Sequence, residues 1–432
     1  MPTAREKPLP RYRSKSEIIG FHKMIMTLLK AMPTQLIHKK LVTLIEQKVP
    51  NAPEGLATAL ADHVLTRAGG PFEFETEDER DIAIEFTPAD IETIEADVRA
   101  FVKTEVPPLV TKIIDDAART ILKSLNRDWP EQREWELLTR EGFCERLEER
   151  WGPAFDILRM MYTISHEIGA MVQRRRRRSR GKRNRVLNDT IMHLHVRACQ
   201  VVAEILCLIE NGFADGAMAR WRTLHEITIV AAVISRFGED LAVRYRAHEA
   251  IEAKRAMDRY RTSHAMLGLA SPTKKEIAEV ERGYAAALTQ YGDRFGSEYG
   301  WAGHHLDRKK PRFIDLEEAA GKLEMRAHYG MASYNVHASP KGIAMRLGLI
   351  REPGQPTGLA GASNIGFVDP AQNSAFDLTL VTSLILQSAN LDDMIQLKIL
   401  VLLRNKIMGK LQAADRRIMK EHRALFHATE QP

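Results

Sequence analysis

Two long apolar stretches joined by a short polar turn constrain the fold of this chain most strongly. Across residues 187–211, apolar side chains recur at intervals of three or four, which predicts a helix with one core-facing side. Residues 211–216, NGFADG, form a short turn, and residues 214–237 are apolar on nearly every side. We therefore expect an antiparallel pair of helices whose second member lies at the centre of a bundle.

Further helical patterns surround this pair. Residues 153–173, 239–266 and about 374–408 each have the periodicity of a helix. Toward the N-terminus, Ser14 begins a capping box, and Thr87 precedes a proline at the first position of another predicted helix. Helices should therefore make up most of the chain.

One segment has the pattern of strands instead. In FEFETEDERDIAIEF, residues 72–86, apolar side chains alternate with polar ones on either side of a polar turn. The segment carries seven acidic residues and one arginine. The sequence thus predicts an all-α protein, a multi-helix bundle with long antiparallel helices, plus one small acidic β-hairpin in the N-terminal region.

The patterns divide the chain into four parts. We predict a flexible basic arm over residues 1–13 and a helical region with the hairpin over residues 14–150. A helical bundle with a basic loop follows over residues 151–408, and residues 409–432 form a C-terminal helix and tail.

The positive charge of the chain is concentrated in the arginine-rich segment, residues 174–185, RRRRRSRGKRNR. This segment holds nine basic residues and no acidic one, whereas the chain as a whole has a net charge of +6. The first 15 residues contribute +4, so the remainder carries −7. A cationic cluster on an acidic body is typical of a dedicated contact surface.

Such a cluster favours binding of a polyanion, RNA or DNA, through its phosphate backbone. No aromatic residue interrupts the run, so base stacking is not indicated. The alternatives are a solvated loop, a contact with an anionic membrane, or an intramolecular contact with the acidic segment 72–86. The predicted nucleic-acid-binding residues are Arg174, Arg175, Arg176, Arg177, Arg178, Arg180, Lys182, Arg183 and Arg185.

Ionisable residues also interrupt the apolar helix, in ARWRTLHEI, residues 219–227. On a helix, Arg222, His225 and Glu226 share one face, whereas Arg220 lies about 140° from His225. One interpretation is an internal Arg222–Glu226 ion pair that fixes the helix register. The other is a catalytic site formed by Arg222, His225, Glu226, Tyr334 and His337.

In the catalytic interpretation, His337 is the general base and Glu226 is either its orienting partner or the acid. Arg222 would stabilise a developing anion. His337 has a second interpretation, as a histidine placed near a helix C-terminus, where it interacts favourably with the helix dipole.

Two family resemblances involve this region. The spacing of Arg220 and His225 resembles the R-x4-H pattern of HEPN ribonucleases, which cleave RNA without a metal, although Trp221 stands where that family has a polar residue. If the resemblance holds, the chain is a metal-independent ribonuclease.

The second resemblance covers roughly residues 188–400. A glycine turn at Gly216 is followed by RTLHE at 222–226, by Arg244 with Tyr245, and by a late Tyr-x-x-His at 334–337. Together these motifs resemble the uncharacterised bacterial family known as domain of unknown function 5677. The resemblance implies an all-helical fold and supplies no activity.

Other site classes have no support in the sequence. There is no HExxH, paired CxxC or aspartate-pair metal motif, and the glycine-rich residues 358–366 lack phosphate-loop spacing, so we expect neither a metal nor a cofactor. Three scattered cysteines and the absence of a signal or transmembrane pattern favour a cytoplasmic protein. A homo-oligomer is left open. The alternative to any binding or catalysis is a helical scaffold or protein-interaction module in which the Arg-Glu-His network is structural.

Overall fold

The computed structural model describes residues 14–66, 72–75, 82–178, 184–350, 358–387 and 389–429. The chain divides into two compact units, Met1–Thr139 and Arg140–Pro432. The first unit contains α1 (Ser14–Lys48), α2 (Leu56–Leu65), α3 (Pro88–Thr104) and the first part of α4 (Val106–Arg178). The predicted arm, residues 1–13, lies outside the described residues.

The first unit has a small apolar core between α1 and α2. Leu41 and Ile45 of α1 pack with Ala57 and Ala61 of α2. The start of α3 matches its prediction, because the Thr87 hydroxyl accepts from the Asp90 N–H and the Asp90 carboxylate accepts from the Thr87 N–H. This capping box satisfies backbone donors that the first helical turn leaves free.

The predicted β-hairpin is wrong. Residues 72–75 and 82–87 have no strand structure, and residues 76–81, between them, lie outside the described part of the chain. The alternating apolar side chains pack separately: the Phe72 ring lies 5.3 Å from the ring of His63 in α2, whereas Ile84 and Phe86 cover the α1–α2 core. In the described residues 72–75 and 82–87, the period-two alternation accompanies packing of apolar side chains on helices and not a backbone ladder.

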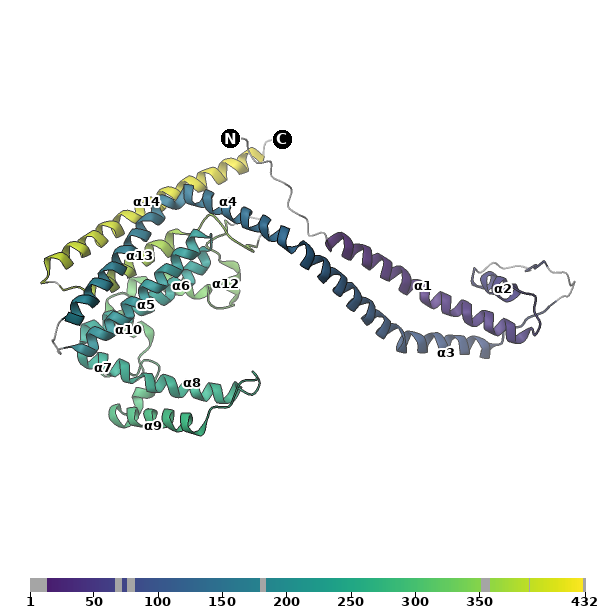
Figure 1. Ribbon diagram of the computed structural model, residues 1–432, viewed down its shortest axis with the longest axis horizontal. Coiled ribbons are helices and arrows are strands. Elements are labelled where there is room, and N and C mark those ends of the chain that lie inside the picture. The colour runs from purple at the N-terminus through teal and green to yellow at the C-terminus, as the bar shows by residue number, and fades with distance from the viewer. Residues whose placement is uncertain are drawn as a thin grey trace. The chain divides into compact units, whose positions relative to one another are not determined.

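The second unit is a helical bundle, and most of its helices are labelled in Figure 1. After the second part of α4, they are α5 (Arg185–Glu210), α6 (Ala214–Phe237), α7 (Glu239–Ala247), α8 (Glu249–Ser263), α9 (Lys274–Tyr291), η1 (Asp293–Gly296), α10 (Phe313–Ala320), η2 (Leu323–Met325), α11 (Arg326–Tyr334), α12 (Pro340–Ala344), α13 (Val368–Ser383) and α14 (Leu391–Thr429).

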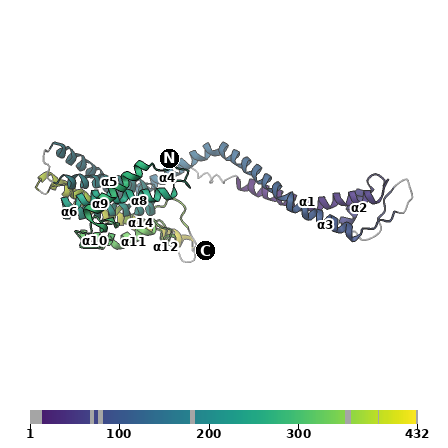
Figure 2. The same ribbon diagram turned by 90° about the horizontal axis from the view of Figure 1, so that it is seen from below.

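Helix α6 lies at the centre of this bundle, as its apolar sequence predicts. It packs against α5, α7, α10, α11 and α13. The largest buried side chains of the core include Trp221 of α6 and Trp151 and Phe155 of α4. The rings of Trp151 and Phe155 contact the ring of Phe367, which lies just before α13. Helices α8 and α9 pack against each other as a hairpin and run side by side in both views (Figures 1 and 2).

Several predicted helix boundaries are wrong. The stretch 239–266 is divided at His248 into α7 and α8, and the stretch 374–408 is interrupted between Ser383 and Leu391. Helix α14 then continues past residue 408 to Thr429. The α4 helix also extends through Arg178, so the first five arginines of the predicted basic loop are helical.

Among the described helices, α5 is the one that is long and apolar enough to cross a membrane by length and composition. Half of its most apolar window is buried inside the protein. It packs on α6, α7 and α13, and core helices of globular proteins meet the same criterion.

Candidate functional site

His225 is completely buried at the centre of the second unit. Its Nδ1 lies 3.2 Å from Oδ2 of Asp377 in α13, and the same carboxylate oxygen accepts a hydrogen bond of 2.8 Å from the Trp221 indole N–H. Trp221 and His225 are four residues apart on α6, so one buried carboxylate binds two successive turns of that helix.

A second carboxylate lies on the other side of the imidazole. Oε1 of Glu317, in α10, is 3.5 Å from the His225 Nε2, which is an ion-pair distance. Within the described residues, neither of these buried atoms has a hydrogen bond. The other Glu317 oxygen accepts from Arg326 of α11 at 2.7 Å. Burial alone would lower the pKa of His225, but Asp377 and Glu317 outweigh it and raise that pKa above its usual value.

Next to this histidine, Arg222 and Glu226 form an ion pair bridged by Tyr329 of α11. The Arg222 guanidinium donates to the Tyr329 hydroxyl at 2.8 Å, and that hydroxyl donates to the Glu226 carboxylate at 2.5 Å. The direct Arg222 Nη2–Glu226 Oε1 distance is 3.3 Å. Burial first, and then the Glu226 contact, raise the pKa of Tyr329 to about 12.

The Tyr329 ring also contacts two cations. The guanidinium carbons of Arg222 and Arg326 lie 4.8 Å and 5.2 Å from its centroid. Side chains of α6, α10, α11 and α13 are thus joined in one polar network. The charges of this network are paired, and His225 is inaccessible to solvent. Both properties suit a structural role in fixing the helix register.

The remaining predicted residues lie apart from this network. Arg220 pairs with Glu204 of α5 and donates to Thr223 at 3.4 Å. Tyr334, at the end of α11, is covered by the Lys341 ammonium, and His337 is exposed. Within the described residues, no hydrogen bond or ion pair joins Tyr334 or His337 to Arg222, His225 or Glu226. Their catalytic assignment stays a prediction.

The part of the arginine-rich segment that belongs to α4, Arg174–Arg178, presents two faces of that helix. At 3.6 residues per turn, Arg177 and Arg178 lie within about 60° of Arg174, and all three side chains are exposed. In the part of the chain that the structure describes, none of the three has a carboxylate partner. Arg175 and Arg176 lie about 100° and 200° around the helix.

Those two arginines are bound to the protein itself. Arg175 makes a bidentate contact of 2.9 and 2.7 Å with the fully buried carboxylate of Asp393, near the start of α14. The Arg175 hydrogen bond lowers the pKa of Asp393 against the effect of burial. Arg176 donates to the backbone carbonyl of Asn188 in α5.

Four further residues belong to the predicted nucleic-acid-binding set. Arg185 is exposed at the start of α5, with its Nε 3.8 Å from an Asp189 carboxylate oxygen. Arg180, Lys182 and Arg183 lie outside the described residues.

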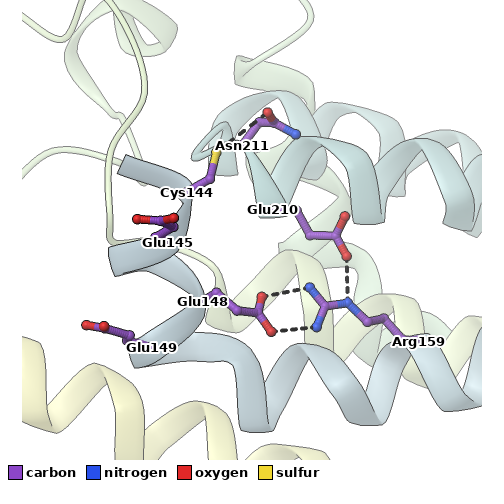
Figure 3. Close-up of a pocket in the computed structure, with 7 residues that line it drawn as sticks. All are labelled: Cys144, Glu145, Glu148, Glu149, Arg159, Glu210 and Asn211. Atoms are coloured by element: carbon purple, nitrogen blue, oxygen red, sulfur yellow. Dashed lines mark hydrogen bonds and ion pairs between the residues drawn. The ribbon is translucent and has the colours of Figure 1, made fainter. Parts of the chain in front are cut away.

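A separate acidic cavity of about 690 Å³ lies between α4 and the end of α5 (Figure 3). Glu148 and Glu210 both bind Arg159, and the Glu148 contact raises the pKa of that guanidinium against burial. Glu145 and Glu149 point away from Arg159. The one basic residue that lines the cavity, Arg159, is therefore already neutralised by acidic residues that line it too. No cluster of three metal-ligating side chains occurs among the residues described.

Sequence reasoning missed four members of the network: Glu317, Arg326, Tyr329 and Asp377. Asp377 offered a signal, because it is the single carboxylate within the apolar run AFDLTLV, residues 375–381. An acidic residue at such a position needs a buried partner. The sequence could not show that His225 is this partner, because the two residues are brought together only by the packing of α6 on α13.

Comparison with known proteins gives one match. Residues 188–355 match the model of a family of unknown function, DUF5677. No curated protein and no solved structure matches the chain. The matched segment runs from α5 past α12 and contains Arg222, His225, Glu226, Glu317 and Tyr329, but not Asp377 or Arg174–Arg178. Over residues 188–355, this chain has the sequence pattern of the DUF5677 family.

Proposed function

We propose that the chain binds a polyanion, RNA or DNA, through the arginine-rich segment. The observation that supports this proposal is the separation of its two faces. Arg175 and Arg176 make contacts that hold α4 to α14 and α5, whereas Arg174, Arg177 and Arg178 face solvent with no carboxylate partner in the described chain. Three unpaired guanidinium groups on one helix face can each contact a phosphate.

A simpler explanation accounts for part of this charge. Cations in the last turn of a helix interact favourably with its dipole, and Arg175–Arg178 occupy that turn of α4. The dipole effect is limited to the last turn, and it does not explain why the basic residues continue to residue 185. Binding of phosphates explains both parts of the segment.

The proposal predicts that Arg174→Gln/Arg177→Gln/Arg178→Gln weakens binding of a labelled single-stranded RNA by roughly tenfold or more at moderate salt. Fluorescence anisotropy measures the affinity. The matched control is Arg99→Gln/Arg119→Gln/Arg417→Gln, which removes the same charge from exposed arginines that each have a carboxylate within one helical turn. Equal affinities of the two triple variants would contradict the proposal.

Metal-independent cleavage of the bound RNA is a further part of the proposal, and His337 is the predicted base that solvent can reach. End-labelled RNA incubated with the protein in EDTA should then be cut by the wild type and not by His337→Ala. RNA that is shifted but remains intact would leave a binding protein without this activity.

The second candidate function is a helical scaffold or protein-interaction module without catalysis. The buried network of His225, Asp377 and Glu317 favours it, because these groups neutralise one another away from solvent. RNA and DNA that are neither shifted nor cut would select this candidate.

A further inference from the structure

The α8–α9 hairpin ends in an apolar tip, residues 264–272, that no other described element of the second unit covers. Met266, Leu267 and Leu269 have 82%, 66% and 50% of their surfaces exposed. In Figure 1 the loop that carries them connects α8 and α9 at the end away from α7. Exposed apolar side chains in such a group mark a contact surface more often than scattered single ones do.

Backbone hydrogen bonds hold the tip in one conformation. The Leu269 N–H donates to the His264 carbonyl at 2.9 Å, and the Gly268 N–H donates to the Ala265 carbonyl at 3.2 Å. With Gly268 at a φ of +65°, this is the Schellman arrangement that terminates a helix. The Tyr260 hydroxyl also donates to the Ala270 carbonyl. The three apolar side chains are therefore presented on an ordered turn.

Basic residues flank the apolar tip in the sequence, between Asp258 and Glu276. Residues 259–275 contain four basic residues and no acidic one. They are Arg259, Arg261, Lys274 and Lys275, all exposed, and no ion pair involves them within the described chain. By contrast, Lys254, farther from the tip, is paired with Asp258 and Glu281.

The two lysines occupy an unfavourable position for their charge. Lys274 and Lys275 are the first residues of α9, where the positive end of the helix dipole repels cations. Helix stability therefore does not account for them. An external anionic partner does account for them, because it would be attracted by the lysine charges and would contact the apolar side chains of the neighbouring tip.

We propose that this tip inserts into the surface of an anionic lipid bilayer. Met266, Leu267 and Leu269 would enter the boundary between headgroups and acyl chains, and the four cations would contact lipid phosphates and carboxylates. A bilayer fits both properties of the tip, since it is apolar inside and negatively charged at its surface. This surface is separate from the arginine-rich segment, so the inference is independent of nucleic-acid binding.

The test is flotation of the full-length protein with vesicles of phosphatidylcholine alone or with added phosphatidylserine. Wild type should float with the phosphatidylserine vesicles and remain behind with phosphatidylcholine alone. Met266→Asp/Leu267→Asp should bind at least about tenfold more weakly, because acidic side chains cannot enter the bilayer surface. Lys274→Gln/Lys275→Gln should also lose roughly tenfold or more of the binding.

Two controls separate this tip from other surfaces. Leu391→Asp/Ile395→Asp makes the same chemical change at exposed apolar positions of α14 and should bind vesicles like the wild type. Repeating the assay in the Arg174→Gln/Arg177→Gln/Arg178→Gln background tests the arginine-rich segment, and the effect of the tip variants should persist there. Absence of wild-type flotation, or equal flotation of wild type and Met266→Asp/Leu267→Asp, would overturn the proposal.

Discussion

At the scale of single residues, exposure distinguishes two neighbouring ion pairs on α6. The His225 and Asp377 side chains are 0% and 5% exposed, whereas Arg222 and Glu226 are 25% and 38% exposed. Solvent screens the Arg222–Glu226 pair, whereas the His225–Asp377 pair lies in a medium of low dielectric constant. The buried pair should therefore contribute much more to the specificity of the fold.

Asp377→Ala should lower the free energy of unfolding by about 3–5 kcal/mol, because it leaves the buried His225 and the Trp221 N–H without their shared partner. Glu226→Ala should cost only about 1 kcal/mol, since that pair is partly solvated. Urea denaturation followed by circular dichroism measures both changes. Equal losses would show that the difference in exposure has no energetic consequence.

The raised pKa of His225 predicts a pH dependence of stability. A folded-state pKa above the unfolded value gives stability that is complete below the unfolded pKa, about 6.5, and is lost as the pH rises through the folded pKa. Asp377→Asn should consequently destabilise the protein more at about pH 6 than at about pH 8.

The difference in Tm between wild type and Asp377→Asn is the readout. Burial lowers the pKa values of His195, His248 and His305. These histidines make stability rise with pH, the opposite of the His225 effect, and they do so equally in wild type and variant. A Tm difference that does not vary with pH would contradict the assignment of His225 as the titrating group.

At the scale of elements, local signals predicted how helices begin but not where tertiary contacts interrupt them. The start of α3 followed from Thr87 and Pro88, because capping depends on residues within one turn. At the interruption between α13 and α14, the Asp393 carboxylate accepts hydrogen bonds from the Gln387 N–H and from Arg175. Arg175 lies 218 residues earlier in the chain, so no local pattern could reveal this contact.

The same limit applies to the candidate site. The sequence placed Arg222, His225 and Glu226 on α6 correctly, since helical geometry alone decides which of them are neighbours. It selected Tyr334 as the tyrosine near them, whereas Tyr329 makes the contacts. Both tyrosines lie on α11, and only the packing of α11 on α6 determines which one faces Arg222.

Substitution of Arg175 should differ from substitution of its neighbours. Arg175→Gln should lower the free energy of unfolding by about 2–3 kcal/mol, because it leaves the buried Asp393 carboxylate without its ion pair. Arg177→Gln should change it by less than about 0.5 kcal/mol, since that side chain is exposed.

The Arg175 effect should also depend on pH. The pKa of Asp393 is lowered, so the stabilisation is present above the unfolded pKa, near 4, and is lost as the pH falls through the folded value. Thermal unfolding at about pH 7 and about pH 3 should therefore show a smaller Arg175→Gln effect in acid. Similar losses for Arg175→Gln and Arg177→Gln would mean that the two helix faces are not distinct.

At the scale of the whole molecule, composition conceals how charge is distributed. The net charge of +6 arises from two short basic stretches, residues 1–15 and 174–185, on a chain that is otherwise acidic. Among the exposed cations that have no ion pair within the described residues are those on two surfaces of the second unit: the outer face of α4 at its C-terminal end and the tip of the α8–α9 hairpin. The first has no apolar side chains between its charges, which suits a phosphate backbone, and the second has three, which suits a bilayer.

The salt dependence of RNA binding tests the central claim most directly. Each phosphate contact contributes about −0.7 to the slope of log affinity against log salt for a single strand. Arg174→Gln/Arg177→Gln/Arg178→Gln should therefore make the slope shallower by about 2, and Arg99→Gln/Arg119→Gln/Arg417→Gln should leave it unchanged. A slope that is the same in wild type and in the Arg174 triple variant would show that this face of α4 does not contact the nucleic acid.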